Sequence, residues 1–331
     1  MTHPFPLPTI KDVRDAAGRI RPHAFRTPLL ESAFLNDLLG TRVLLKAEVL
    51  QRTGSFKFRG AYNCISRIDR EAFPGGVVAC SSGNHAQGVA EAARLCGIPA
   101  IIVMPDDAPA IKIARTRRSG AEVVQYDRYR EDRDAIAAAL AADRRAQFVA
   151  PFDNLHVIAG QGTVGLEIAE QAKAAGADLE AVLTPCSGGG LASGICLAIE
   201  HAMPNAGVYT AEPEGFDDFA RSLRSGRREE NAPDARSICD ALLMPHPGEL
   251  TFAVSRARLA GGLAVPDSET RKAVAFAFSE LKLVVEPGGA VALAAMLAGR
   301  FKASGRPVAI VLSGGNIDPK MLDECLSGAN S

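Results

Sequence analysis

The sequence predicts an α/β protein with two lobes, each with a mainly parallel, twisted sheet flanked by helices. Short runs rich in Val and Ile alternate with Ala-rich helical patterns along most of the chain, which is typical of parallel βαβ units. The 331 residues allow two domains, at about 100–200 residues each. The 31 glycines suit tight turns between strands and helices.

The clearest series of βα units lies between Gly76 and Pro151. Apolar runs there predict buried strands, and the longer Ala-rich stretches between them predict helices. The strands are expected at 76–80, 100–104, 122–126 and 147–150, and the helices at 86–95, 108–119 and 130–142.

A second series supplies the other lobe. Its strands are expected at 181–184, 207–211 and 307–312, its helices at 191–203, 267–283 and 288–297, and a polar surface excursion at 224–237. We therefore expect a larger domain formed by residues 1–54 and 153–331, with residues 55–152 inserted as a smaller domain.

Composition excludes several classes of protein. The 37 basic and 38 acidic residues give a net charge of −1, so nucleic acid and anionic membranes are not expected partners. The longest mainly apolar stretch, 290–298, is far shorter than the roughly 20 residues that cross a bilayer, and no secretory signal is visible. Seven scattered cysteines without a CxxC pair indicate reduced thiols and a cytoplasmic location.

Four loops that follow predicted strands or open helices carry candidate chemistry, because ligands of open parallel sheets lie at the carboxyl ends of the strands. The first is 53–60, which places Lys57 just inside a helix. The positive end of the helix dipole disfavours the ammonium form and so favours a nucleophilic amine. The alternative is a surface lysine, which the flanking Phe56 and Phe58 make less typical.

The second loop, 81–85, brings two serines, an asparagine and a histidine to the start of a helix. Such a turn can bind a carboxylate or a ring oxygen. It can equally be a capped helix entry without a ligand, for which serine and asparagine are well suited.

The third loop, 187–191, has three consecutive glycines before a helix, so its N–H groups can hold a phosphate. A dinucleotide fingerprint is the alternative, with Gly188, Gly190 and an acidic Glu212 after the next strand. That fingerprint needs a small Gly or Ala where this chain has Ser193. A phosphate cradle is therefore favoured.

The fourth loop, 313–316, places one hydroxyl at the end of the apolar strand 307–312. One ligand explains all four loops, namely a pyridine aldehyde that carries a phosphate. Lys57 would meet the aldehyde, loop 187–191 the phosphate, Asn84 the ring oxygen and Ser313 the ring nitrogen.

These motifs occur together in an order that resembles the fold-type II pyridoxal-phosphate enzymes, in their threonine/serine dehydratase and serine racemase branch. The resemblance covers nearly the whole chain and implies the two-lobed fold of tryptophan synthase β-like enzymes. The motifs that carry it are 54–60, 82–85, 160–163, 187–190 and 313–316.

The resemblance implies roles for individual residues. Lys57 would bind pyridoxal 5′-phosphate covalently, Phe56 would pack beside the ring, and Asn84 and Ser313 would bind the ring oxygen and nitrogen. The phosphate would be held by Ser187, Gly188, Gly189, Gly190 and Leu191, and the substrate carboxylate by Ser81, Ser82, Asn84 and His85. In the racemases, the residue that matches Ser82 is the base on the face opposite the lysine.

The resemblance also implies a divalent cation, bound by a glutamate, a backbone carbonyl and an aspartate. Glu212, Phe216 and Asp218 match that pattern, and all-oxygen ligands suit Mg²⁺ or Ca²⁺. The alternative is a solvated acidic turn. A homodimer is implied as well.

The activity implied is a dehydratase that converts L-threonine or L-serine into a 2-oxo acid and ammonia through an aminoacrylate. A hydroxyl at Ser313 cannot keep the ring nitrogen protonated as a carboxylate could, which favours prompt loss of the β-hydroxyl. Alternatives are a serine racemase and a 3-hydroxyaspartate dehydratase, the latter less favoured because no receptor for a second carboxylate is evident near His85 or Gly288–Gly289. A non-catalytic ligand-binding protein and a dinucleotide-dependent oxidoreductase are the alternatives from other classes.

Overall fold

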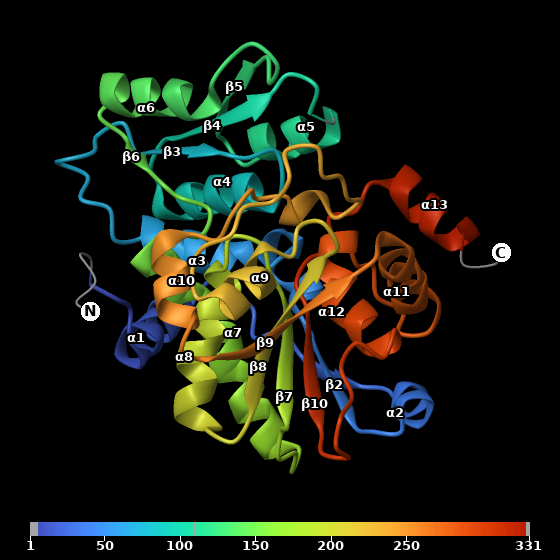
Figure 1. Cartoon of the computed structure of the whole chain (residues 1–331). Coiled ribbons are helices and arrows are strands. Elements are labelled where there is room, and N and C mark those ends of the chain that lie inside the picture. Colours follow the sequence, from blue (N-terminus) through green and yellow to red (C-terminus); the bar gives the residue numbers. More distant parts are fainter. Residues whose placement is uncertain (1–5, 109, 329–331) are drawn as a thin grey trace.

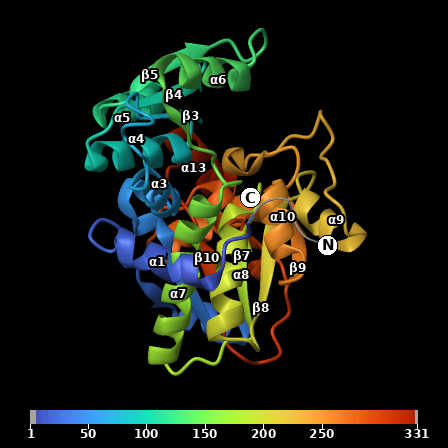
Figure 2. The ribbon, with the colours of Figure 1, turned by 90° about the vertical axis from the view of Figure 1, so that its left-hand side faces the viewer.

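The computed structural model describes residues 6–108 and 110–328 (Figure 1). The expected helix at 108–119 and the ends of the expected larger domain thus include positions outside the described residues. Two lobes are visible in Figure 1 and, from the side, in Figure 2. The upper lobe contains a four-stranded sheet with helices α4 to α6, and the larger lower lobe contains a six-stranded sheet.

The six-stranded sheet has the order β1-β2-β10-β7-β8-β9, and every pairing except β1 with β2 is parallel. Its strands are β1 (Leu29–Glu31), β2 (Val43–Ala47), β10 (Val308–Leu312), β7 (Ala181–Pro185), β8 (Gly207–Pro213) and β9 (Leu259–Val265). The four-stranded sheet is entirely parallel. Its strands, in spatial order, are β5 (Glu122–Tyr126), β4 (Ala100–Pro105), β3 (Val77–Cys80) and β6 (Gln147–Phe148).

Helices cover both sheets. They are α1 (Ile10–Ile20), α2 (Ala33–Leu39), α3 (Lys57–Ile65), α4 (Asn84–Cys96), α5 (Ala110–Arg118), α6 (Arg133–Arg144), α7 (Leu155–Ala174), α8 (Gly190–Ala202), α9 (Asp218–Ser225), α10 (Glu249–Ser255), α11 (Asp267–Ser279), α12 (Pro287–Leu297) and α13 (Pro319–Gly328). Three short 3₁₀ helices are η1 (Glu48–Leu50), η2 (Arg52–Gly54) and η3 (Asp240–Leu242). Of the helices described, none combines the length and apolarity needed to span a membrane.

The larger sheet is buried on both faces. Along β10, Val308, Ile310 and Leu312 pack with α11 and α12, whereas Ala309 and Val311 pack on the opposite face with α7 and α8. This period of two, with apolar residues on both sides, explains why the strand is a continuous apolar run in the sequence.

Close helix packing in the larger lobe depends on glycine. A Cβ added to Gly162 of α7 would lie 2.8 Å from the carbonyl of Gly194 in α8, and one added to Gly160 would lie 2.6 Å from Cα of Gly60 in α3. The motif 160–163 thus lets α3 and α8 approach α7, and in this way it positions the start of α3, where Lys57 lies.

The structure confirms the parallel α/β class and all seven predicted strands, with shifts of a few residues at their ends. The predicted helix at 267–283 ends earlier, at Ser279. The predicted domain division stays a prediction. It is supported by strand membership, since the four-stranded sheet takes all its strands from residues 77–148.

Candidate active site

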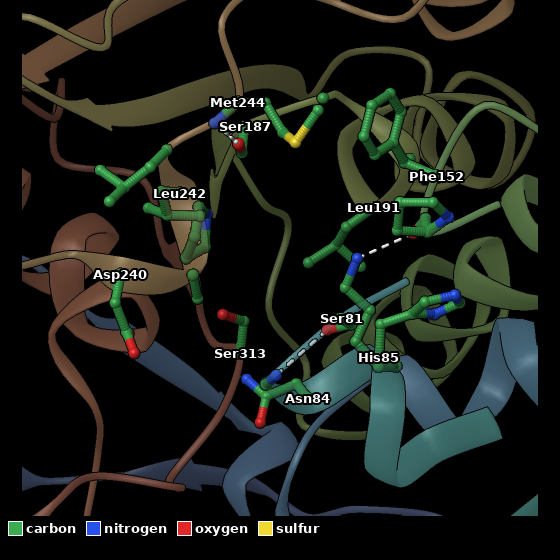
Figure 3. A pocket seen from close by; sticks show the side chains of 18 of the residues that line it. Ser81, Asn84, His85, Phe152, Ser187, Leu191, Asp240, Leu242, Met244 and Ser313 are labelled. Atoms are coloured by element: carbon green, nitrogen blue, oxygen red, sulfur yellow. Dashed lines mark hydrogen bonds between the residues drawn. The ribbon is translucent and has the colours of Figure 1, made fainter. Parts of the chain in front are cut away.

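A cavity of about 480 Å³ lies between the lobes, where loops from both sheets meet (Figure 3). Its walls include every residue predicted for the cofactor and the substrate carboxylate, from Phe56 to Ser313. The four loops that the sequence singled out are therefore brought together. Its volume falls in the range of small-molecule sites.

Lys57 is the first residue of α3, and its Nζ donates a hydrogen bond to the carbonyl of Pro151 at 2.8 Å. Burial lowers the pKa of this amine to about 8. The helix dipole predicts a pKa shift in the same direction, but the cause here is removal of the amine from water. The ring centroid of Phe56 lies 5.3 Å from Nζ, so both predicted residues stand on one wall.

The turn 187–191 forms an open cradle at the start of α8. Gly189 has φ +94°, and a Cβ on Gly188 would lie 2.5 Å from the ring of Phe152, so both positions require glycine. No described group accepts a hydrogen bond from the N–H groups of residues 188–191, although these residues are buried. Buried, unpaired N–H groups that converge on a cavity fit a phosphate. The Ser187 hydroxyl instead accepts from the N–H of Met244.

Two more predicted cofactor ligands lie on the floor of the cavity (Figure 3). The amide of Asn84 at the start of α4 accepts from Asn316 at 2.7 Å and donates to Glu286. Ser313 follows β10 and is 5% exposed. Its hydroxyl faces the cavity and has no hydrogen-bond partner among the described residues, so it is free to meet a ring nitrogen.

The predicted carboxylate receptor lies between β3 and α4. The Ser81 hydroxyl accepts from the N–H of Gly83, while that of Ser82 has no partner within the described part of the chain. His85 is held by the Val149 carbonyl at 2.9 Å. Burial, together with the charge of Lys57, lowers the pKa of His85 to about 3, so this imidazole is neutral and acts as a hydrogen-bonding group.

Glu286 is a site residue that the sequence analysis missed. It precedes α12, is 5% exposed, and contacts Asn84 through its carboxylate. Burial, followed by the charge of Asp240, raises the pKa of Glu286 to about 7. The only signal for it in the sequence is an acidic residue directly before Pro287 and the pair Gly288–Gly289.

The three predicted cation ligands lie apart from the cavity lining. Glu212 is the second-last residue of β8 and is fully buried; its carboxylate accepts hydrogen bonds from the N–H groups of Phe219 and Ala220. Asp218 accepts from Asn231, while its Oδ2 is buried without a partner. The described residues contain no cluster of three or more His, Cys, Asp or Glu suited to a metal. The predicted cation ligands comprise only two side chains of these types, Glu212 and Asp218, together with the backbone carbonyl of Phe216.

Known proteins match this chain over nearly its full length. An L-threo-3-hydroxyaspartate ammonia-lyase of Saccharomyces cerevisiae is 42% identical over 97% of each chain, and a serine racemase of Schizosaccharomyces pombe is 38% identical over 94% of this chain and 95% of its own. The crystal structure of T.th. threonine deaminase superposes with a TM-score of 0.89 at 43% identity, covering 94% of this chain and 99% of the other.

The model of one protein family, described as "Pyridoxal-phosphate dependent enzyme", matches residues 20–314. The match includes Lys57, the glycine cradle and Ser313, and it decides against the dinucleotide-dependent and the non-catalytic alternatives. The chain belongs to the family of pyridoxal-phosphate dependent enzymes.

Proposed function

We propose that this enzyme removes water from a small β-hydroxy amino acid, such as L-threonine or L-serine, and releases a 2-oxo acid and ammonia. The observation that carries the proposal is the pairing of Lys57 with Ser313 in one cavity. A hydroxyl beside the ring nitrogen leaves the cofactor a weaker electron sink than a carboxylate would, which favours elimination over long-lived carbanion chemistry. Relatives named as threonine and hydroxyaspartate ammonia-lyases support this reaction class.

Pyridoxal phosphate, when bound, supplies the electron sink for charge that develops at the substrate Cα. Lys57, Asn84, Ser313 and the cradle at 187–191 would hold it. The unpaired N–H groups of the cradle and the free Ser313 hydroxyl fit its phosphate and its ring nitrogen.

The remaining chemistry is proton transfer by this chain. With a pKa of about 8, Lys57 has an appreciable neutral fraction near neutral pH, so Nζ can accept the proton from Cα. The ammonium so formed can return that proton to the departing β-hydroxyl, which leaves as water. The loop 81–85 would hold the α-carboxylate and thereby orient the Cα–H bond toward Nζ.

Racemisation is the second candidate, because the Ser82 hydroxyl has no described partner and lines the same cavity. A hydroxyl on the face opposite Lys57 could return a proton to Cα with inversion. Several relatives are named serine racemases. We expect Ser82→Ala to abolish racemisation while largely sparing dehydration of the L-isomer, as measured by chiral chromatography and 2-oxo acid release.

The central test is Lys57→Ala. We expect turnover of L-threonine and L-serine to fall by about 10³-fold or more, because the base and the covalent anchor are removed together. The visible absorption of the bound cofactor should also disappear. Lys272→Ala, which changes an exposed lysine on α11, should change neither. Retained turnover in Lys57→Ala would refute the assignment.

We also propose a divalent cation at Glu212, Asp218 and the Phe216 carbonyl. Two features support it: the buried Oδ2 of Asp218 lacks a partner, and no described N–H donates to the Phe216 carbonyl. Hard oxygen ligands of this kind suit Mg²⁺ or Ca²⁺.

Finally, we propose that the protein is a cytoplasmic homodimer. All seven cysteines are free thiols, which suits a reducing compartment. Phe34 and Leu38 of α2 and Phe278 of α11 are 42–55% exposed, and apolar side chains of this size favour an interface with a second copy. Light scattering should give twice the chain mass of 34.8 kDa, and a monomer would contradict the dimer.

A further inference from the structure

The start of α12 packs against the loop that carries Ser313. The N–H of Glu286 donates to the carbonyl of Gly314 at 3.0 Å, and the N–H of Ser313 donates to the carbonyl of Gly289 at 3.4 Å. A Cβ added to Gly289 would clash with the carbonyl oxygen of Gly314, so the two backbones approach closely because this residue is glycine. The position of Glu286 is therefore tied to the loop that is predicted to meet the ring nitrogen.

This packing places the carboxylate of Glu286 beside the amide of Asn84, which faces the cavity (Figure 3). Oε1 of Glu286 accepts a hydrogen bond from Nδ2 of Asn84. A Cβ added to Gly314 would clash with this Oε1 and would lie 3.1 Å from Nδ2, so glycine leaves the space in which the two side chains meet. Glu286 is 5% exposed and Asn84 is 8% exposed, and a hydrogen bond in such surroundings is stronger than one in water.

The oxygen of the Asn84 amide is held by a second partner, Asn316. Nδ2 of Asn316 donates to Oδ1 of Asn84 at 2.7 Å and to the carbonyl of Thr53 at 2.8 Å. Because a backbone carbonyl can only accept, the contact with Thr53 fixes which end of the Asn316 amide carries the N–H groups. Asn316 in turn fixes the orientation of Asn84.

The two partners together decide which group Asn84 offers to a ligand. An amide nitrogen has two N–H groups, and Glu286 accepts from one of them. If the amide were rotated by half a turn, its oxygen would face an oxygen of Glu286 and its nitrogen would face the nitrogen of Asn316. The amide therefore presents its second N–H to the ligand, and a donor at that place favours the ionised form of a ring hydroxyl.

We propose that Glu286 is a positioning residue, which together with Asn316 fixes the Asn84 amide so that an N–H meets the ring oxygen of pyridoxal phosphate. This inference rests on the proposed function, because it deepens the role predicted there for Asn84. Glu286 acts through Asn84, and it gives a function to the carboxylate that the sequence analysis missed.

The test measures the Kd of pyridoxal phosphate for the cofactor-free protein, together with the absorption spectrum of the bound cofactor. We expect Glu286→Ala to raise the Kd by about 10-fold, the usual cost of losing a hydrogen bond to a charged group. Part of the visible absorption should also move to shorter wavelength, because a released amide can present its oxygen and so favour a protonated ring hydroxyl. Glu286→Gln keeps an oxygen that can accept from Asn84, so its Kd should stay within about 3-fold of the wild type. Glu280→Ala, which changes an exposed glutamate at the end of α11, should change neither the Kd nor the spectrum.

A double-mutant cycle shows whether Glu286 acts through Asn84. In the Asn84→Ala protein, Glu286→Ala should change the Kd by less than about 2-fold, because the side chain that Glu286 positions is absent. An equal increase with and without Asn84 would refute the positioning role, and so would a Kd for Glu286→Gln as high as that for Glu286→Ala.

Asn316→Ala tests the same amide from its other end and leaves the buried carboxylate in place. It should raise the Kd and move the absorption in the same direction as Glu286→Ala, so it also decides the matter if Glu286→Ala does not fold. An unchanged Kd and spectrum in Asn316→Ala would refute the fixed amide. If the cofactor binds as described but no β-hydroxy amino acid is converted, the proposed function fails and the positioning role stands. If L-threonine or L-serine is converted while Glu286→Ala binds the cofactor unchanged, only the positioning role fails.

Discussion

Two groups of carboxylates in the interior differ in whether a basic side chain neutralises their negative charge. In the first, the Glu48 and Glu167 carboxylates meet the cations of Arg59 and Lys46 at 2.7–2.8 Å. Arg59, Lys46 and Glu48 have fully buried side chains. Although burial alone would raise it, the pKa of Glu167 is held below its usual value by Arg59 and Lys46.

The second group, Glu212 and Asp218, has no basic side chain within 4 Å among the described residues. Burial, and then the charge of Asp218, raises the pKa of Glu212 well above its usual value. Burial likewise raises the pKa of Asp218 to about 6.

This difference distinguishes carboxylates that stabilise the fold from carboxylates that are available to a ligand. Charges paired in a closed network fix the position of α3 and need nothing further. Buried carboxylates without a cation, such as Glu212, Asp218 and Glu286, carry a desolvation cost that the hydrogen bonds they accept offset only in part, since the pKa of each stays raised. Uncompensated groups are therefore where a ligand or proton is expected.

Arg59→Met removes the central cation of the first group, and we expect it to have the largest effect on stability. The substitution leaves the buried Glu48 and the partly buried Glu167 with Lys46 alone, and we expect the free energy of unfolding to fall by about 3–5 kcal/mol. Urea denaturation followed by circular dichroism measures it.

Arg26→Met is the matched control. Arg26 pairs with Glu170 on the same helix, α7, also at 2.7 Å, but both side chains are more than half exposed. Its loss should be below about 1 kcal/mol. Similar decreases in the free energy of unfolding for the two variants would show that burial does not make the ion-pair network more important for stability.

Glu286→Gln tests a carboxylate without a cation through the pH dependence of stability. The pKa of Glu286 is raised from 4.5 to about 7, so between these values the folded protein holds a proton that the unfolded chain has released. Stability contributed by the protonated form is therefore lost as pH rises through this window, by about 3 kcal/mol in total. In cofactor-free protein, Glu286→Gln should remove that loss and gain stability over the wild type at pH 8. An unchanged pH dependence would contradict an uncompensated carboxyl.

Much of the fold could be predicted because its signals are local. Buried parallel strands are continuous apolar runs, as in β10, and this made the two-lobed α/β class evident. Three strands and several helices, α7 among them, were not predicted. Strand β9 contains Gly261 and Gly262, which weaken a strand pattern. Most of the first half of α7 is buried, so no amphipathic period marks it.

The site residues also differ in whether a local signal in the sequence predicts them. Lys57, the glycine cradle and Ser313 belong to short motifs that bear the chemistry themselves. Glu286 does not, since its place depends on a partner far along the chain. Glu286 meets Asn84 across 202 residues. Only the packed structure shows such a pair.

The smallest expected effect is the stabilisation by a divalent cation. Mg²⁺ or Ca²⁺ at Glu212 and Asp218 would supply the positive charge that Arg59 and Lys46 supply in the first group. A cation at a hundredfold excess over its Kd adds about 2.7 kcal/mol, which for a chain of this size corresponds to roughly 5 °C in Tm. Differential scanning fluorimetry with the ion and with EDTA measures this difference. Asp218→Asn should abolish it, while Asp178→Asn, at a largely exposed ion pair, should not. A shift that persists in Asp218→Asn would place the cation elsewhere, and no shift in the wild type would leave the two carboxylates as an uncompensated pair that the rest of the fold tolerates.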